Sequence, residues 1–169
     1  MATTFFVRNI NFSAARAYLL SGAFILGNLL LPQLCHLTPY GGNILLPIYF
    51  FTLIAAYKFG WQVGIATAIL SPLMNSALFG MPPVAVLPFI LIKSALLATV
   101  AAVVAGKTQK LSILHLLVVV LVYQIVGSSI ESLILGDFAA GMVDFKLAFS
   151  GMLIQVVGGY LLLKALAKK

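Results

Sequence analysis

The sequence predicts an all-α integral membrane protein, a bundle of about six transmembrane helices. Of its 169 residues, 63% are hydrophobic and only 8% are charged, whereas soluble domains carry about 25% charged residues. The apolar runs are long and do not alternate with polar residues, as the strands of a membrane barrel would. Backbone groups in lipid need internal hydrogen bonds, so runs of this kind are expected to form helices.

Six apolar runs approach the length of about 20 residues that spans about 30 Å of hydrocarbon. In chain order they are Ala14–Leu31, Ile44–Tyr57, Trp61–Phe79, Val84–Ala105, Leu111–Leu135 and Leu147–Leu163. The second run is short for a full span. If it is re-entrant, the alternative is a topology of four or five spans. The connections leave no room for a soluble domain, and we expect residues 1–169 to form a single transmembrane domain.

The basic residues predict the orientation of this bundle. Eight of them fall on one side, namely Arg8, Arg16, Lys58, Lys107, Lys110, Lys164, Lys168 and Lys169. The other side receives Lys146, and Lys93 lies within the fourth run. Cytoplasmic loops carry the excess of Lys and Arg, so both termini are predicted to be cytoplasmic. Because the charges are scattered, they do not form the continuous basic face of a nucleic-acid-binding protein.

Two ionisable residues, Lys93 and Glu131, lie inside predicted spans, where a charge costs several kcal/mol and usually marks a functional site. On the fifth run Gln124 and Ser128 precede Glu131 at helical spacing, so the three share one stripe that points toward the outer face.

We interpret these residues as part of a substrate-binding set that opens to the outside. Its other members lie on other runs and on the outer connection: Asn75, Gln155, Tyr40 and Asn43. The alternative interpretation is that Lys93 and Glu131 only neutralise each other, while the amides hydrogen-bond between helices.

The outer connection that follows the first run contains the adjacent pair Cys35 and His36. Thiolate and imidazole suit a soft metal or a cobalt centre, but two adjacent residues do not form a metal-site spacing, and a structural role is favoured. No metal or other cofactor is therefore predicted. For His115, near the inner end of the fifth run, an interfacial structural role is favoured over catalysis.

Small residues recur every four positions at the start of the first run, at Ser13, Ala17 and Ser21. This spacing lets another helix approach closely in lipid. We predict either packing against the protein's own helices or docking of a separate membrane subunit.

The sequence lacks the features of an enzyme. It contains no phosphate-binding glycine loop followed by Lys and Ser or Thr, so the chain is not expected to hydrolyse ATP. It also lacks closely spaced carboxylates or a His-rich helix for hydrolysis or metal catalysis. We therefore predict a binding or transport protein, with a small membrane scaffold as an alternative.

One stretch of the sequence is similar to a known family. It runs from Leu45-Leu46-Pro47-Ile48 through Phe59-Gly60-Trp61-Gln62-Val63-Gly64 and Ser71-Pro72-Leu73 to Phe79-Gly80-Met81-Pro82-Pro83. With its size and six spans, the chain resembles the substrate-binding S components of energy-coupling factor (ECF) transporters.

The resemblance implies a subunit of a prokaryotic cytoplasmic membrane that binds a vitamin or related micronutrient at the outer face. It further implies delivery inward with a transmembrane coupling subunit and two ATPase subunits. Many members dock through two alanines four residues apart, where this chain has Ser13, Ala17 and Ser21. This departure leaves a solitary, motor-free transporter as an alternative.

Overall fold

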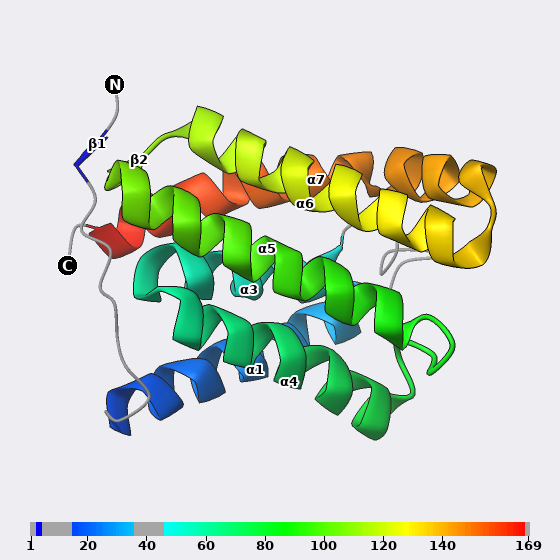
Figure 1. Ribbon diagram of the computed structural model, residues 1–169. Coiled ribbons are helices and arrows are strands. Elements are labelled where there is room, and N and C mark those ends of the chain that lie inside the picture. Colours follow the sequence, from blue (N-terminus) through cyan, green and yellow to red (C-terminus); the bar gives the residue numbers. More distant parts are fainter. Residues whose placement is uncertain (1–2, 5–14, 36–45, 168–169) are drawn as a thin grey trace.

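The computed structural model describes residues 3–4, 15–35 and 46–167, with the backbone alone described at 3–4 and 140–142 (Figure 1). Within these residues it contains six helices: α1 (Ala15–Cys35), α3 (Pro47–Phe59), α4 (Trp61–Phe79), α5 (Leu87–Thr108), α6 (Ile113–Leu135) and α7 (Phe138–Ala167). Strands β1 (Thr3–Thr4) and β2 (Lys110–Leu111) pair antiparallel, which the sequence did not predict. The predicted all-α bundle is confirmed.

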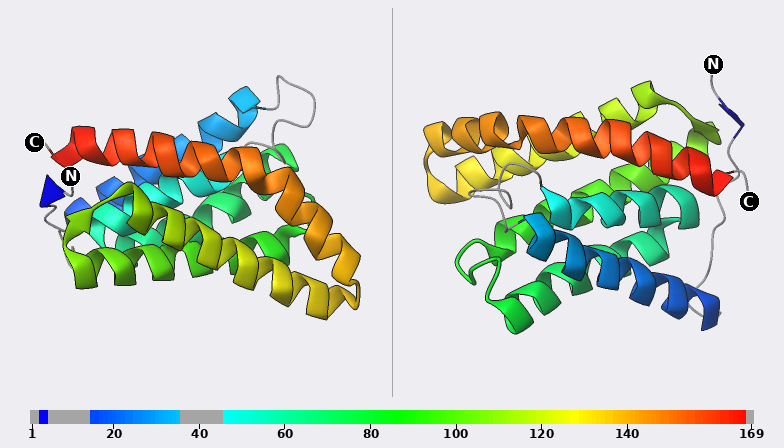
Figure 2. Two further views of the ribbon diagram at one scale, coloured as in Figure 1. Left: turned by 90° about the horizontal axis from the view of Figure 1, so that it is seen from above. Right: turned by 180° about the vertical axis from the view of Figure 1, so that it is seen from behind.

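Five of the helices are long and apolar enough to cross a membrane, so the chain is a multi-pass membrane protein. The exception is α3, whose 13 residues extend about 20 Å at 1.5 Å per residue. It lies at the centre of the bundle, where it packs against α1, α4, α5 and α7 (Figure 2). Helix α3 is therefore a short core helix that the longer helices surround.

Glycine and proline set several helix ends, which is why the predicted boundaries of α4 match the observed ones. Pro47 occupies the first turn of α3, where its missing N–H is not needed. Gly80 and Gly136 follow the last residues of α4 and α6 with φ of 66° and 68°. Glycine adopts this left-handed conformation readily, and it commonly ends helices.

The predicted start of the last span was wrong, because α7 begins at Phe138 and not at Leu147. Asp137 precedes the helix and accepts a hydrogen bond from the Ala139 N–H at 2.8 Å, as an N-cap residue does. The charges of Asp144 and Lys146 indicated a loop, but the helix continues through them. Figure 2 shows that α7 bends in its N-terminal part.

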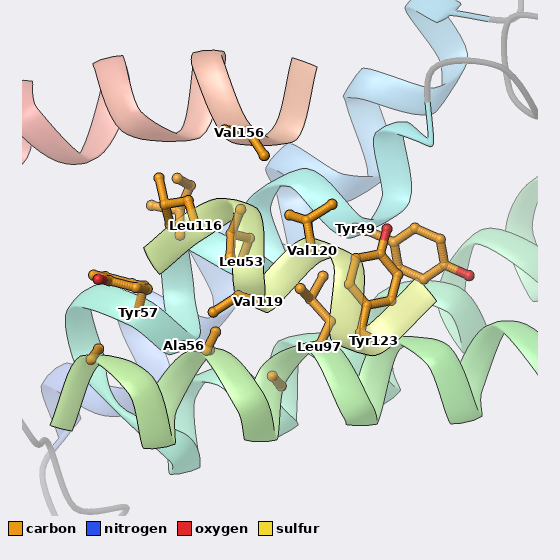
Figure 3. Packing of buried hydrophobic residues seen from close by; sticks show 14 of the residues in the cluster. Tyr49, Leu53, Ala56, Tyr57, Leu97, Leu116, Val119, Val120, Tyr123 and Val156 are labelled. Carbon is orange, nitrogen blue, oxygen red and sulfur yellow. The ribbon is translucent and has the colours of Figure 1, made fainter. Parts of the chain in front are cut away.

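The hydrophobic core lies between α3, α5, α6 and α7 (Figure 3). Leu53, Leu97 and Val119 are fully buried there. Near one end of this core, the Tyr57 hydroxyl donates to the Lys110 carbonyl at 2.8 Å, which joins the end of α3 to the α5–α6 connection. This core holds the ends of the helices that form the candidate site in a fixed arrangement.

Strands β1 and β2 and the end of α7 lie at the same end of the bundle (Figure 1). The start of α1 and the ends of α3 and α5 also lie at this end, which also holds the end of α7. Together with β2 they carry most of the basic residues that the structure describes, namely Arg16, Lys58, Lys107, Lys110 and Lys164. The segregation of basic residues is thus a property of the fold, while the cytoplasmic location of this end stays a prediction.

Candidate functional site

A cavity of about 570 Å³ lies between α3, α5, α6 and α7, toward the end of the bundle away from β1 and the end of α7. Its apolar lining is Leu46, Ile48, Tyr49, Val86, Phe89, Ile90, Ala139, Val143 and Leu147, and its polar lining is Lys93, Gln124, Glu131, Asp137 and Asp144. Ligand pockets typically measure about 300–1,000 Å³ and combine apolar walls with a few polar groups. The cavity is therefore of a size and composition that suit a small molecule.

A buried ammonium group with two carboxylates forms the polar centre of this cavity. The Lys93 Nζ donates to Glu131 Oε2 and, at 2.8 Å, to Asp144 Oδ2. The Lys93 side chain is 6% exposed, against 18% for Glu131 and 35% for Asp144. The lysine thus lies beneath the two carboxylates, which are the groups more open to the cavity.

Two further side chains of α6 complete this ion cluster, which comprises Lys93, Glu131, Asp144, Gln124 and Ser128. Asp144 Oδ2 accepts hydrogen bonds from Gln124 Nε2 at 2.9 Å and from Ser128 Oγ at 3.0 Å. The predicted stripe of α6 therefore does converge with Lys93 from α5. The sequence interpretation missed Asp144, because it assigned that residue to a loop.

Gly127 makes room for the lysine. A Cβ at this position would lie 2.5 Å from Lys93 Cγ, which is far inside van der Waals contact. The aliphatic stem of Lys93 therefore crosses α6 at its glycine, and the ammonium group reaches Glu131 and Asp144 beyond it. No other residue type at position 127 leaves this path open without a shift of the side chain.

Gln155, a predicted site residue, lies outside the lining of the cavity. Its Oε1 accepts a hydrogen bond from the Tyr123 hydroxyl at 3.0 Å. The Tyr123 ring in turn packs against Tyr49, with ring centroids 5.5 Å apart (Figure 3). Because Tyr49 lines the cavity, Gln155 supports its wall through two intervening aromatic rings.

Asn75, another predicted site residue, belongs to a separate buried network between α1, α3 and α4. Its Nδ2 donates to the Asn28 carbonyl at 2.8 Å. The Asn28 side chain donates to Thr52 Oγ1 at 3.0 Å and to Ser71 Oγ at 3.2 Å. The structure thus does not bring Asn75 to the ion cluster, and its role in ligand binding stays an untested prediction.

Most of the residues singled out in the outer connection lie outside the part of the chain that the structure describes. Tyr40, Asn43 and His36 lie outside the described residues, and Cys35 is the last residue of α1. Among the residues that the structure describes, no three His, Cys, Asp or Glu side chains are grouped as metal ligands.

His115 Nδ1 lies 3.2 Å from the Lys110 carbonyl, consistent with a structural role.

Two of the three residues of the predicted docking stripe are buried in this arrangement. Ala17 is fully buried and packs with Ala55 and Val63, and Ser21 is only 5% exposed. Both face the protein's own helices, so neither can contact a separate subunit in this arrangement. Ser13 lies outside the described residues. Ala17 and Ser21 thus contribute to packing between the protein's own helices, which was the other interpretation of the spacing, and docking of a partner subunit stays an untested prediction.

The charges at the cavity are opposite in sign to those of the chain as a whole. The sequence contains three acidic residues and has a formal net charge of +7. All three acidic side chains, Glu131, Asp137 and Asp144, line the cavity, with Lys93 as the one basic group among the described lining residues. Since a partly buried charge interacts more strongly than one in water, the cavity can attract and orient a charged small molecule.

Comparison of the chain with family models, with curated proteins and with solved structures finds no match.

Proposed function

We propose that the chain is the substrate-binding S component of an ECF-type importer in a prokaryotic cytoplasmic membrane. In this role it captures a vitamin or related micronutrient and passes it inward with a transmembrane coupling subunit and two ATPase subunits. The observation that carries the proposal is the cavity of about 570 Å³ around the ion cluster, at the end of the bundle away from β1 and the end of α7.

The hydrogen bonding of the ion cluster supports ligand binding over a purely structural ion pair. Lys93 donates to one oxygen of each carboxylate. The other oxygens, Glu131 Oε1 and Asp144 Oδ1, accept no hydrogen bond from the described residues. Placing charges in a membrane is costly, and two open acceptors beside a cavity are expected where a ligand completes their hydrogen bonding.

The charge distribution supports the direction of transport. The basic end of the bundle, by the positive-inside rule, faces the cytoplasm, so the cavity then lies toward the outer face. The described residues contain no nucleotide-binding loop, and a partner must supply the energy for concentrating a nutrient.

A second candidate is a solitary, motor-free transporter. One observation favours it: the residues predicted to dock a coupling subunit, Ala17 and Ser21, are buried. In this case the chain would bind the same class of ligand but would not associate with ATPase subunits. Ligand binding is common to both candidates and separates them from a membrane scaffold.

Mass spectrometry of small molecules released from the purified chain tests the shared claim. We expect one compound to be released in stoichiometric amount from the wild type. The folded triple variant Lys93→Met, Glu131→Gln, Asp144→Asn should release little or none, because it lacks all three charges of the ion cluster. Equal release from both proteins would refute this site, and release of lipid alone would favour a scaffold. Co-purification of ATPase subunits distinguishes the ECF component from the solitary transporter.

A further inference from the structure

The arrangement of donors and acceptors in the cavity also indicates the charge of the ligand. We propose that the cavity selects an organic cation, a small molecule with a protonated amine attached to an apolar or aromatic body. This inference rests on the proposed ligand-binding function and narrows its substrate class.

The first argument is the balance of charge. Lys93 is the one basic group among the described lining residues, and it pairs with the carboxylates of Glu131 and Asp144; Asp137 is a third acidic residue of the lining. The ion cluster alone therefore carries one excess negative charge when its groups are ionised. A cationic ligand balances this charge, whereas an anionic ligand adds to it.

The second argument is the direction of the hydrogen bonds. The Lys93 ammonium group already donates to both carboxylates and is only 6% exposed. An anionic ligand would have to draw Lys93 away from them. The acceptors Glu131 Oε1 and Asp144 Oδ1, in contrast, bond to no described residue, and a ligand that donates hydrogen bonds can reach them without any rearrangement.

The third argument is a buried amide oxygen. Gln124 is 1% exposed and lines the cavity. Its Nε2 donates to Asp144, which fixes the orientation of the amide. Its Oε1 is buried and has no hydrogen-bond partner in the part of the chain that the structure describes. Buried acceptors normally have a partner, and a donor group on a bound ligand would supply one.

The walls of the cavity suit the rest of such a molecule. Tyr49 and Phe89 contribute aromatic rings, and Ile90 and Leu147 contribute aliphatic surface. Aromatic faces attract cations, and aliphatic side chains cover an apolar body. The volume of about 570 Å³ exceeds what a bare metal ion needs and fits an amine with one or two rings.

Three probes of nearly equal shape and different charge test the proposal: 2-phenylethylamine, 2-phenylethanol and phenylacetate. Their affinities are measured on the full wild-type chain in lipid nanodiscs by calorimetry or by ligand-detected nuclear magnetic resonance. We expect the amine to bind at least about tenfold more tightly than the alcohol and the acid, because a hydrogen bond to a charged group changes affinity by about ten- to a hundredfold.

Two variants test whether the carboxylates of Asp144 and Glu131 cause the preference for the amine. Asp144→Asn and Glu131→Gln each leave Lys93 one carboxylate, so each should fold. Both should weaken amine binding by about ten- to a hundredfold and leave binding of the alcohol nearly unchanged. Lys107→Gln is the control and should alter neither affinity, because it removes an exposed charge in the last turn of α5, and α5 ends at the opposite end of the bundle.

Tighter binding of the acid than of the amine, or unchanged amine affinity in both folded variants, would overturn the cationic assignment and leave the proposed function intact. Absence of binding by all three probes would also overturn this ligand class. The proposed function fails separately, when the purified wild type releases no small molecule.

Discussion

The close approach of Lys93 to Gly127 allows a quantitative test of the arrangement that holds the ion cluster. In the substitution Gly127→Ala, the new Cβ would lie 2.5 Å from Lys93 Cγ and 3.3 Å from Lys93 Cε. The lysine stem must therefore move, and its ammonium group must move with it. Gly22 on α1 offers a matched control, because a Cβ there meets no atom within 4 Å.

The expected magnitude follows from two opposing effects. Replacement of Gly by Ala inside a helix stabilises it by about 1 kcal/mol. Overpacking a tight contact costs about 1 to 3 kcal/mol. Gly22→Ala should thus raise the free energy of unfolding by up to about 1 kcal/mol. The free energy of unfolding of Gly127→Ala should be about 1 to 3 kcal/mol lower than that of Gly22→Ala, because Gly127→Ala adds the overpacking cost.

Unfolding of both variants by SDS titration in mixed micelles measures this difference. The same comparison is repeated in a Lys93→Ala background, where Cγ is absent. If the destabilisation by Gly127→Ala disappears there, the lysine side chain is the source of the clash. This double-mutant cycle isolates the contact between the two residues. An equal gain in stability at Gly127 and Gly22 would refute the packing of Lys93 against α6.

Three further predictions concern other parts of the bundle. Asn28→Leu removes the three hydrogen bonds of the Asn28 side chain, which donates to Thr52 and Ser71 and accepts from the Phe51 N–H. It should lower the free energy of unfolding by about 2 kcal/mol, at about 0.6 kcal/mol per bond. Ligand affinity in the folded variant should be unchanged, and a large loss of affinity would place this network in the site. Ala17→Trp overfills a fully buried position and should destabilise the protein and weaken ligand binding. A stable variant that binds ligand but no longer co-purifies with a partner subunit would mean that Ala17 is a docking residue. In a background with Cys35→Ala, a cysteine at Asp137 should react with an impermeant thiol reagent from outside the cell and one at Lys107 should not; the reverse pattern would invert the predicted topology.

Much of the fold could be predicted from the sequence, because the signals that mark transmembrane helices are local. Gly60 and Gly80 bracket an apolar run, and α4 was predicted with its observed ends at Trp61 and Phe79. The start of α7 was not, since the charges of Asp144 and Lys146 resemble those of a loop. In the structure Asp144 lies four residues before Ala148, which is buried, so helical spacing puts both residues on the inner face of α7.

The candidate site could be predicted only in part, because contacts between helices are not a local property of the sequence. Lys93 and Glu131 were identified because a charge within an apolar run is costly wherever it points. Asn75 and Asn28 are polar residues in equally apolar runs, but which polar residues meet depends on the rotation and packing of the helices. The sequence does not show that Asn28 joins Asn75 at one interface while Gln124 joins Asp144 at another.

The claim at the centre of this account is that the cavity beside Lys93, Glu131 and Asp144 holds a small molecule in the working protein. An experimental density map of the chain, purified gently from its own membrane, tests this most directly. The account predicts compact non-protein density between Tyr49 and the two carboxylates, within hydrogen-bond distance of Glu131 or Asp144. A cavity closed by the protein's own side chains, or filled by a lipid acyl chain with no polar contact to the cluster, would contradict it.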